Sequence, residues 1–337
     1  MRTQFRDSEN TSAQETDKHE NLQKSTLLEA DEAKTETEKK EVSETSELPD
    51  NKADTTDFDE SILDDNGDEV NEGEFLPPNK TFRLNGIEYT TDDNGKIYCI
   101  DGEKIPNTNY ILNEVTYKTD DNGNIYSIDR KLQPNITYEL NGNTYTTDEK
   151  GRIIGCVAKP VRSPENPRDN EAQRQAGGED RRLSDQGGHI VGRDMNGDGG
   201  IGNLIAMDSR INQSDYKCME NNIKASLDEG KDVTTKTEMT YSDDSERPDI
   251  ITVTVTVDGK DTVYIFDNNL DGVLDAEVIE KSPVAKQIIK DYPEAHVSSI
   301  RKEYDEDGKL VRTTVRITYT DENGNIRRNQ IYINSRR

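Results

Sequence analysis

The sequence predicts an α+β protein built from several unlike segments. Only 29% of its 337 residues are hydrophobic and 34% are charged, which is too polar for one uniform globule. A repeated pattern fills the first half after an acidic stretch, and alternating strand patterns with a few helical stretches fill the second half. We expect four parts: a disordered acidic tail at 1–78, a β-hairpin array at 79–157, a mixed domain at 158–280 and a small α+β appendage at 281–337.

Charge is distributed unevenly along the chain. The net charge is −27, but residues 1–78 hold 24 Asp and Glu against 8 Lys and Arg. Residues 155–225 hold 11 Asp and Glu against 10 Lys and Arg. The acid therefore lies mostly in the tail, and the total does not exclude nucleic acid as a partner.

The sequence contains neither a predicted membrane span nor a recognisable secretory signal. No apolar run approaches the roughly 18 residues of a membrane span, so we expect no transmembrane helix. The first residues lack the apolar core of a cleavable secretory signal. We expect a protein exported by a route without such a signal, or otherwise a cytoplasmic one.

The three cysteines are far apart and form no C-x-x-C pair, so neither a disulfide framework nor a zinc site is expected.

The array at 79–157 is an internal repeat of 28 residues. Its copies begin at Asn79, Asn107 and Asn135, and each alternates aromatic or Leu residues with polar ones before a Gly-centred turn. Asn-Gly supplies the positive φ that a tight hairpin turn needs. Each copy is predicted to be a hairpin that stacks on its neighbours, because a lone hairpin cannot bury a face. We interpret the aromatic positions as core, with carbohydrate stacking as the alternative.

The second half alternates linker, loop, strand and helix. A linker at 158–184 is rich in Pro, Arg, Asn and Gln. Strand patterns at 232–267 predict a β-meander. Beyond it, the sequence predicts a helix at 282–291 and then three strands, which are expected at 296–304, 309–319 and 325–334.

The segment between linker and meander carries the candidate chemistry. Gly187 and Gly188 precede His189 and allow close approach of the backbone. Asn212 follows Asn203 by nine residues, and Glu220 follows Asn212 by eight. An amphipathic helix is predicted over about 214–229, ended by Gly230.

These residue types suit phosphodiester hydrolysis. His189 titrates in the range of a general base that takes a proton from water. Amide oxygens suit Mg²⁺, which keeps several water ligands. Each residue also has a structural interpretation: His189 as a satisfied structural histidine, Asn212 as a helix N-cap, Glu220 as a solvated helix position and Asn203 as a turn residue.

The Gly-Gly-His, Asn-Leu, Asn and Glu pattern resembles the DNA/RNA non-specific endonucleases of the ββα-metal (His-Me finger) type. The nearest branch contains DNA-entry nucleases and EssD-like proteins of type VII secretion. The resemblance covers about 174–267. It implies that His189 is the general base, Asn212 the direct protein ligand of Mg²⁺, with Mn²⁺ as a substitute, Glu220 a residue that orders water around the metal, and Asn203 a residue that holds the site together.

One position departs from the family pattern. The wider family has Asp-Arg-Gly-His, and Gly187 stands here where that Arg would be. The missing positive charge must come from another residue. The candidates from sequence are Arg181, Arg182 and Arg210.

The resulting hypothesis is a metal-dependent endonuclease that cuts DNA, with RNA as a further substrate. The order of tail, array and nuclease is that of a secreted bacterial toxin, which implies an immunity protein and secretion machinery as partners. The alternative is a repeat-bearing surface or adhesion protein with an inactive nuclease-like fold.

A second metal site is predicted from a loop after the meander. Its residues match several positions of an EF-hand-type calcium loop, with Glu277 at position 11 instead of 12. The structural interpretation is a negatively charged surface turn. The expected Ca²⁺ ligands are Asp267, Asn269, Asp271 and Asp275.

Overall fold

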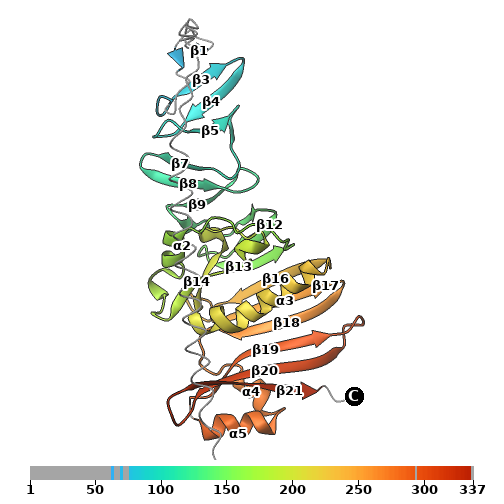
Figure 1. Ribbon diagram of the computed structural model, residues 1–337. Coiled ribbons are helices and arrows are strands. Elements are labelled where there is room, and N and C mark those ends of the chain that lie inside the picture. Colours follow the sequence, from blue (N-terminus) through green and yellow to red (C-terminus); the bar gives the residue numbers. More distant parts are fainter. Residues whose placement is uncertain (1–61, 64–68, 71–75, 293, 335–337) are drawn as a thin grey trace, which may run out of the picture. The chain divides into compact units, whose positions relative to one another are not determined.

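The computed structural model describes residues 62–63, 69–70, 76–292 and 294–334 (Figure 1). These residues are mostly β-sheet with few helices, so the predicted α+β class is met only in part. Most of the predicted acidic tail lies outside the described residues. Within it, β1 (Ile62–Leu63) and β2 (Glu69–Val70) pair antiparallel.

The first two copies of the repeat fold into two sheets of four strands each. One sheet has the order β3-β4-β5-β6 and the other β10-β9-β8-β7. The strands are β3 (Thr81–Leu84), β4 (Ile87–Thr91), β5 (Ile97–Ile100), β6 (Glu103–Lys104), β7 (Asn109–Leu112), β8 (Val115–Thr119), β9 (Ile125–Ile128) and β10 (Lys131–Leu132). Corresponding strands of the two sheets are 28 residues apart, which is the spacing of the sequence pattern.

The third copy of the repeat belongs to a larger sheet. Its strands are β11 (Thr137–Leu140), β12 (Asn143–Thr147) and β13 (Ile153–Ala158). The turn between β11 and β12 has positive φ at Asn141 (54°) and Gly142 (72°), as the Asn-Gly pattern predicts. Tyr138 and Tyr145 pair across these strands, stack at 5.3 Å and are buried, so here the aromatic positions are core.

Nine strands form the main sheet, in the order β11-β12-β13-β16-β17-β18-β19-β20-β21. Its further strands are β16 (Val233–Thr240), β17 (Ile250–Val257), β18 (Lys260–Asp267), β19 (His296–Tyr304), β20 (Leu310–Thr320) and β21 (Ile326–Asn334). Every neighbouring pair is antiparallel. The sheet has no break at the predicted boundaries 157/158 and 280/281, so the four-part division stays a prediction.

The meander and the C-terminal strands confirm the alternating patterns of the sequence. β17 and β18 pair over their whole length around the turn at Asp258 and Gly259. The predicted C-terminal helix is α5 (Pro283–Asp291), capped by the Ser282 side chain. A short helix, α4 (Asp275–Ile279), precedes it.

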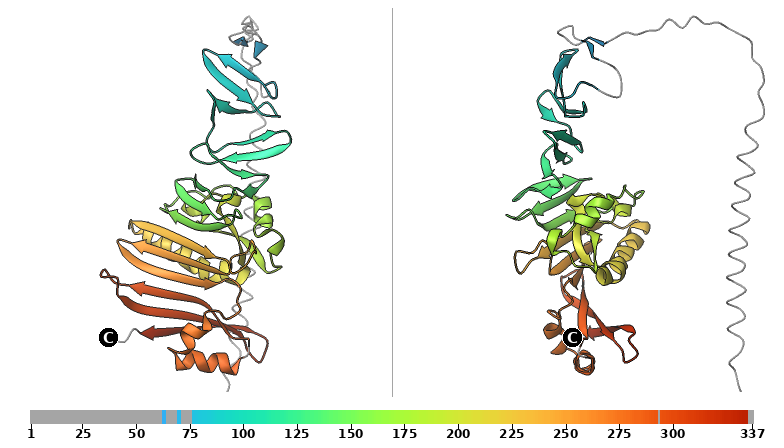
Figure 2. Two further views of the ribbon diagram at one scale, coloured as in Figure 1. Left: turned by 180° about the vertical axis from the view of Figure 1, so that it is seen from behind. Right: turned by 90° about the vertical axis from the view of Figure 1, so that its left-hand side faces the viewer.

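The core lies between the main sheet and a helix that crosses one face of it (Figures 1 and 2). This helix is α3 (Lys217–Asp228), preceded by a π-helical segment, η4 (Ile211–Tyr216). Met219 and Ile223 of α3 are buried against strand residues such as Val253. No helix among the described residues is long and apolar enough to span a bilayer.

A separate pair of strands stands between the linker and η4. β14 (Asp185–His189) pairs antiparallel with β15 (Leu204–Asp208). A short helix, α2 (Asn170–Gln175), packs on β14. β14, β15 and α3 are the elements that carry or support the candidate site residues.

Candidate active site: a cleft around His189

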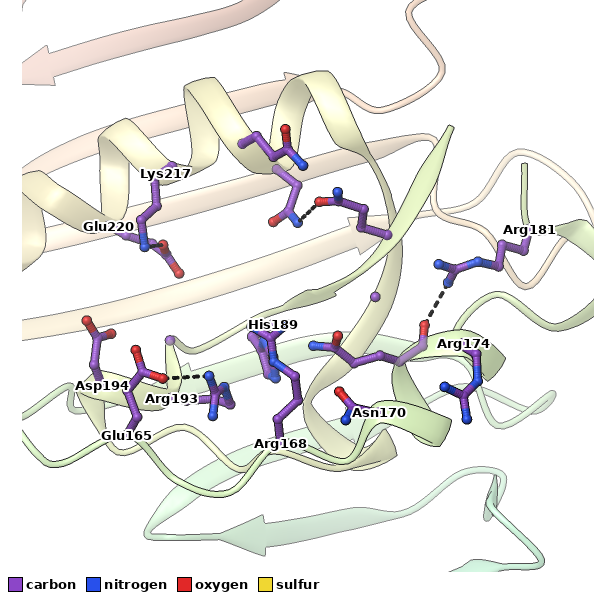
Figure 3. Close-up of a pocket in the computed structure, with 16 residues that line it drawn as sticks. Glu165, Arg168, Asn170, Arg174, Arg181, His189, Arg193, Asp194, Lys217 and Glu220 are labelled. Atoms are coloured by element: carbon purple, nitrogen blue, oxygen red, sulfur yellow. Dashed lines mark hydrogen bonds and ion pairs between the residues drawn. The ribbon is translucent and has the colours of Figure 1, made fainter. Parts of the chain in front are cut away.

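One cleft of about 770 Å³ gathers His189, Asn212 and Glu220 (Figure 3). They come from the end of β14, from η4 and from α3. The sequence spacing therefore brings these three candidates to one cavity. Asn203, the fourth candidate, does not line it.

The two glycines before His189 are explained by packing. A Cβ at Gly187 would lie 2.7 Å from the backbone of Gln173 in α2, and one at Gly188 would lie 2.8 Å from Met207 in β15. Neither position has room for a side chain without a shift of its neighbours. An Arg at 187, as in the wider family, would therefore require the backbone of α2 to shift.

His189 reaches the cleft as a neutral ring. The side chain is half-buried, and its buried Nε2 has no hydrogen-bond partner among the described residues. Its pKa is lowered to about 4, first by burial and then by the positive charges of Arg193 and Arg168. At neutral pH the ring therefore has a nitrogen free to accept a proton.

The side chain of Asn212 is held in one orientation. Its Nδ2 donates a hydrogen bond of 2.8 Å to Oε1 of Gln186 in β14. Among the described residues, no group donates a hydrogen bond to the Asn212 carbonyl oxygen. This oxygen is thus left for a ligand in the cleft, and Gln186 is a site residue that the sequence did not reveal.

Glu220 and its neighbours form the acidic part of the cleft. Burial raises the pKa of Glu220, and the ammonium group of Lys217, 3.1 Å away, opposes that shift. Asp194 also lines the cleft and pairs with Lys224 of α3 at 3.0 Å. In Figure 3 Glu220, Asp194 and Glu165 lie toward one end of the cleft.

The other end of the cleft is basic. Figure 3 places Arg174 and Arg181 there, with Arg168 beside His189. The guanidinium groups of Arg168 and Arg174 make no hydrogen bond or ion pair with any residue that the structure describes, although both residues line the cleft. Their guanidinium groups are free to bind an anion.

The three arginines expected to replace the family's Arg make hydrogen bonds or ion pairs with other residues. Arg181 lines the cleft but donates to three backbone oxygens, at 2.8, 3.1 and 2.9 Å. Arg182 donates to the backbone oxygen of Asn269. Arg210 pairs with Asp208 at 3.0 Å. The Arg-rich linker was visible in the sequence, but which of its guanidinium groups stay unpaired, those of Arg168 and Arg174, depends on the fold.

Asn203 is a buried structural link beside the site. Its Oδ1 accepts from the Val191 amide and from the Tyr145 hydroxyl, both at 2.9 Å. Its Nδ2 donates to the backbone oxygens of Val191 and Asp198, at 2.8 and 2.7 Å. With all these bonds made, Asn203 ties the chain that follows His189 to the third hairpin, and has no free group for substrate.

The predicted calcium loop is held by hydrogen bonds of its own. The Asp267 carboxylate accepts two backbone amides of the loop, at 2.8 and 3.1 Å. Oδ1 of Asn269 accepts from the Arg247 guanidinium at 2.6 Å, and Oδ1 of Asp275 accepts from the Val297 amide at 2.7 Å. In the described part of the chain, no group of three or more His, Cys, Asp or Glu is placed to hold a metal. The structure therefore gives the Ca²⁺ expectation no support.

Comparison with known proteins assigns a family to the region that holds the cleft. Residues 134–259 match the family model of the DNA/RNA non-specific endonucleases. The chain therefore carries a DNA/RNA non-specific endonuclease domain, a hydrolase domain, as the His-Asn-Glu pattern predicted. The match begins at the third hairpin, which agrees with the pairing of β13 and β16.

Curated relatives point to one branch of this family. Over 102 residues, the chain is 35% identical to the type VII secretion system protein EssD of Staphylococcus aureus strain USA300, and equally to that of strain NCTC 8325 / PS 47. The matched region is 28% of this chain and 17% of each relative. The chain thus spans less than a fifth of the length of these relatives.

Proposed function

We propose that the chain is an endonuclease that hydrolyses the phosphodiester bonds of DNA, with RNA as a further substrate. The observation that carries the proposal is the neutral His189 ring, which belongs to a residue that lines the cleft and whose buried Nε2 has no partner among the described residues. The base takes a proton from a water molecule as its oxygen bonds to phosphorus and the bond to the leaving oxygen breaks. Support comes from the family match.

The donor set of the cleft suits Mg²⁺, with Mn²⁺ as a substitute. The Asn212 carbonyl oxygen is the direct ligand in this proposal, and the Glu220 carboxylate acts on water around the metal. Mg²⁺ prefers oxygen ligands and keeps several waters, so a site with few protein ligands is sufficient. When bound, the ion supplies positive charge opposite the phosphoryl oxygens.

Arg168 is the proposed protein cation for the phosphate. It stands beside His189 and has no competing partner among the described residues, unlike Arg181, Arg182 and Arg210. A guanidinium binds two phosphate oxygens at once and stabilises the charge that develops on them. Contacts to phosphate carry no sequence information, which fits a non-specific nuclease.

The elements of the site fit the ββα-metal arrangement. β14 and β15 are the two strands, with the base at the end of the first. η4 and α3 supply the helix with the Asn and Glu. We take this set as the ββα-metal unit of the domain.

Cleavage assays with the full chain test the proposal. Supercoiled plasmid and a single-stranded RNA are incubated with Mg²⁺, with Mn²⁺ and with EDTA. We expect cutting of the plasmid in both metals and none in EDTA. Absence of cutting under every metal would remove the proposal and favour the surface or adhesion protein.

A role as a secreted toxin extends this proposal. It is supported by the likeness to a type VII secretion system protein, which covers only part of each chain. The hairpin units then serve as a spacer, and the expected partners are secretion machinery and an immunity protein. Growth of a bacterial host that expresses the full chain in the cytoplasm tests toxicity. Arrested growth with wild type, and normal growth with an equally abundant His189→Ala form, is the expected result.

A further inference from the structure

Asp215 lies three residues after Asn212, in the same π-helical segment. Its side chain is buried, with 5% of the residue exposed. Its Oδ2 accepts hydrogen bonds from the hydroxyls of Ser299, at 2.7 Å, and Ser298, at 3.2 Å. Its Oδ1 accepts from the Arg316 guanidinium. These three partners come from β19 and β20, more than eighty residues further along the chain.

A β-bulge in β19 allows both serines to contact Asp215. Val297 pairs with Ile317 and Ser299 pairs with Arg316, so Ser298 is an extra residue in β19. Successive side chains of a regular strand point to opposite faces, and a bulge changes that alternation locally. Two consecutive serines therefore reach one carboxylate, where a regular strand would offer one.

Two other bonds hold the π-helical segment to β14 and to the residue that follows it. Gln186 accepts from Asn212, and the Tyr216 hydroxyl donates to the backbone oxygen of Ile190 at 2.8 Å. Asp215, between these two residues in the chain, is held by β19 and β20 instead. A π-helical turn is a rare conformation that tertiary contacts must maintain. The position of Asn212 thus depends on both sets of contacts.

The C-terminal contacts lie outside the matched family region. That region ends at residue 259, so it includes Asp215 but none of its strand partners Ser298, Ser299 and Arg316. The main sheet joins the two parts: β17, the last strand within the matched region, pairs with β18, and β18 pairs with β19.

We propose that β19 and β20 act as a clamp that positions the metal ligand Asn212 through Asp215. This inference rests on the proposed function. Asp215 and Arg316 are positioning residues: neither lines the cleft, and they act through η4. The strength of metal binding at the nuclease site then depends on strands that the nuclease family match does not contain.

Matched variants of the full chain test the clamp. Arg316→Gln removes the guanidinium that faces Asp215, and Arg316→Lys retains its charge. Arg312→Gln is the control, because Arg312 lies on the same strand and its ion-pair partner is Glu303, 3.6 Å away. Ser299→Ala is a milder variant that removes one hydrogen bond from Asp215.

Three quantities are measured for each variant. They are the affinity for Mn²⁺ without substrate, from the electron paramagnetic resonance signal of free Mn²⁺, the Mg²⁺ concentration that gives half-maximal plasmid cleavage, and the melting temperature. We expect Arg316→Gln to weaken Mn²⁺ binding and raise the half-maximal Mg²⁺ concentration about tenfold, with a rate at saturating Mg²⁺ within about twofold of wild type. Arg316→Lys recovers most of the affinity, and Arg312→Gln equals wild type.

Other results overturn the clamp. A folded Arg316→Gln that binds Mn²⁺ as wild type does would mean that the contacts only pack the sheet. If Arg316→Gln does not fold, unchanged Mn²⁺ affinity in Ser299→Ala overturns the clamp in the same way. A wild-type chain that neither binds Mn²⁺ nor cuts DNA contradicts the proposed function itself, which separates the two failures.

Discussion

Gln186 accepts a 2.8 Å hydrogen bond at its Oε1 from Nδ2 of Asn212, which leaves the Asn212 carbonyl oxygen without a donor among the described residues. A residue of β14 thereby sets which atom a residue of the π-helical segment η4 presents to the cleft. The site depends on such links between elements as much as on the residues that touch substrate.

Loss of the Gln186 acceptor should therefore weaken the metal site. Gln186→Met keeps the length of the side chain but frees the Asn212 amide to rotate. We expect the Mg²⁺ concentration for half-maximal cleavage to rise about tenfold, which corresponds to about 1.4 kcal/mol. Gln186→Glu retains an acceptor and is expected to stay closer to wild type. Equal Mg²⁺ dependence in Gln186→Met and wild type would show that the bond does not orient the ligand.

The hydroxyl of Tyr145 should stabilise the fold, whereas the hydroxyl of Tyr117, at the equivalent position of the second repeat, should not. It donates to the buried Asn203, so Tyr145→Phe leaves one acceptor less satisfied. We expect a loss of about 1 to 2 kcal/mol in the free energy of unfolding by urea. Tyr117→Phe, at the equivalent repeat position, is the matched control and should change little. Equal losses in the two variants would contradict a specific role for the Asn203 bond.

Arg247 should be the most sensitive charged residue of the domain. It is buried and pairs with both carboxylate oxygens of Asp185, at 2.8 and 3.0 Å. Asp185 is the first residue of β14. Arg247→Met leaves a buried carboxylate without its partner, which costs about 3 to 5 kcal/mol. The double variant with Asp185→Asn should recover part of this loss. Thermal unfolding of the wild type, Arg247→Met, Asp185→Asn and the double variant measures both effects. A double variant no more stable than Arg247→Met would argue against a stabilising Arg247–Asp185 ion pair.

The lowered pKa of His189 should appear in the dependence of stability on pH. In the folded state this pKa is about 4, below the ordinary value of about 6.5 in the unfolded chain. The unfolded state therefore binds more protons as the pH falls from about 6.5 toward 4, and the folded state loses stability over that range. At pH 5 this loss is about 2 kcal/mol relative to pH 8. His189→Ala should lose that much less on acidification, and an identical loss in both proteins would contradict the shift.

Local patterns predicted the elements well. The alternation in β17 and β18, the turn at Asp258 and Gly259, and the helix capped by Ser282 all have short-range signals. The spacing of the His, Asn and Glu residues was sufficient to place three of them at one cleft. The 28-residue period of the sequence also equals the spacing between corresponding strands of the first two repeat sheets.

Long-range contacts could not be predicted in this way. The pairing of Gly155 with Glu238 joins the third hairpin to the meander, and no local pattern encodes it. The burial of Asn203 and the contact of Asp215 with Arg316 depend on the same long-range closure. The structure gives the expected Ca²⁺ ligands no support, because oxygens of Asp267, Asn269 and Asp275 accept hydrogen bonds that the sequence does not reveal.

Plasmid cleavage by the full-length His189→Ala variant tests the central claim most directly. The variant is compared with wild type in Mg²⁺ at matched concentration, after circular dichroism has shown that it is folded. Our account predicts that the wild type nicks and linearises the plasmid, and that the variant loses at least about 100-fold in rate because no base takes the proton from water. A folded variant that cuts at the wild-type rate would contradict the assignment of His189 as the base.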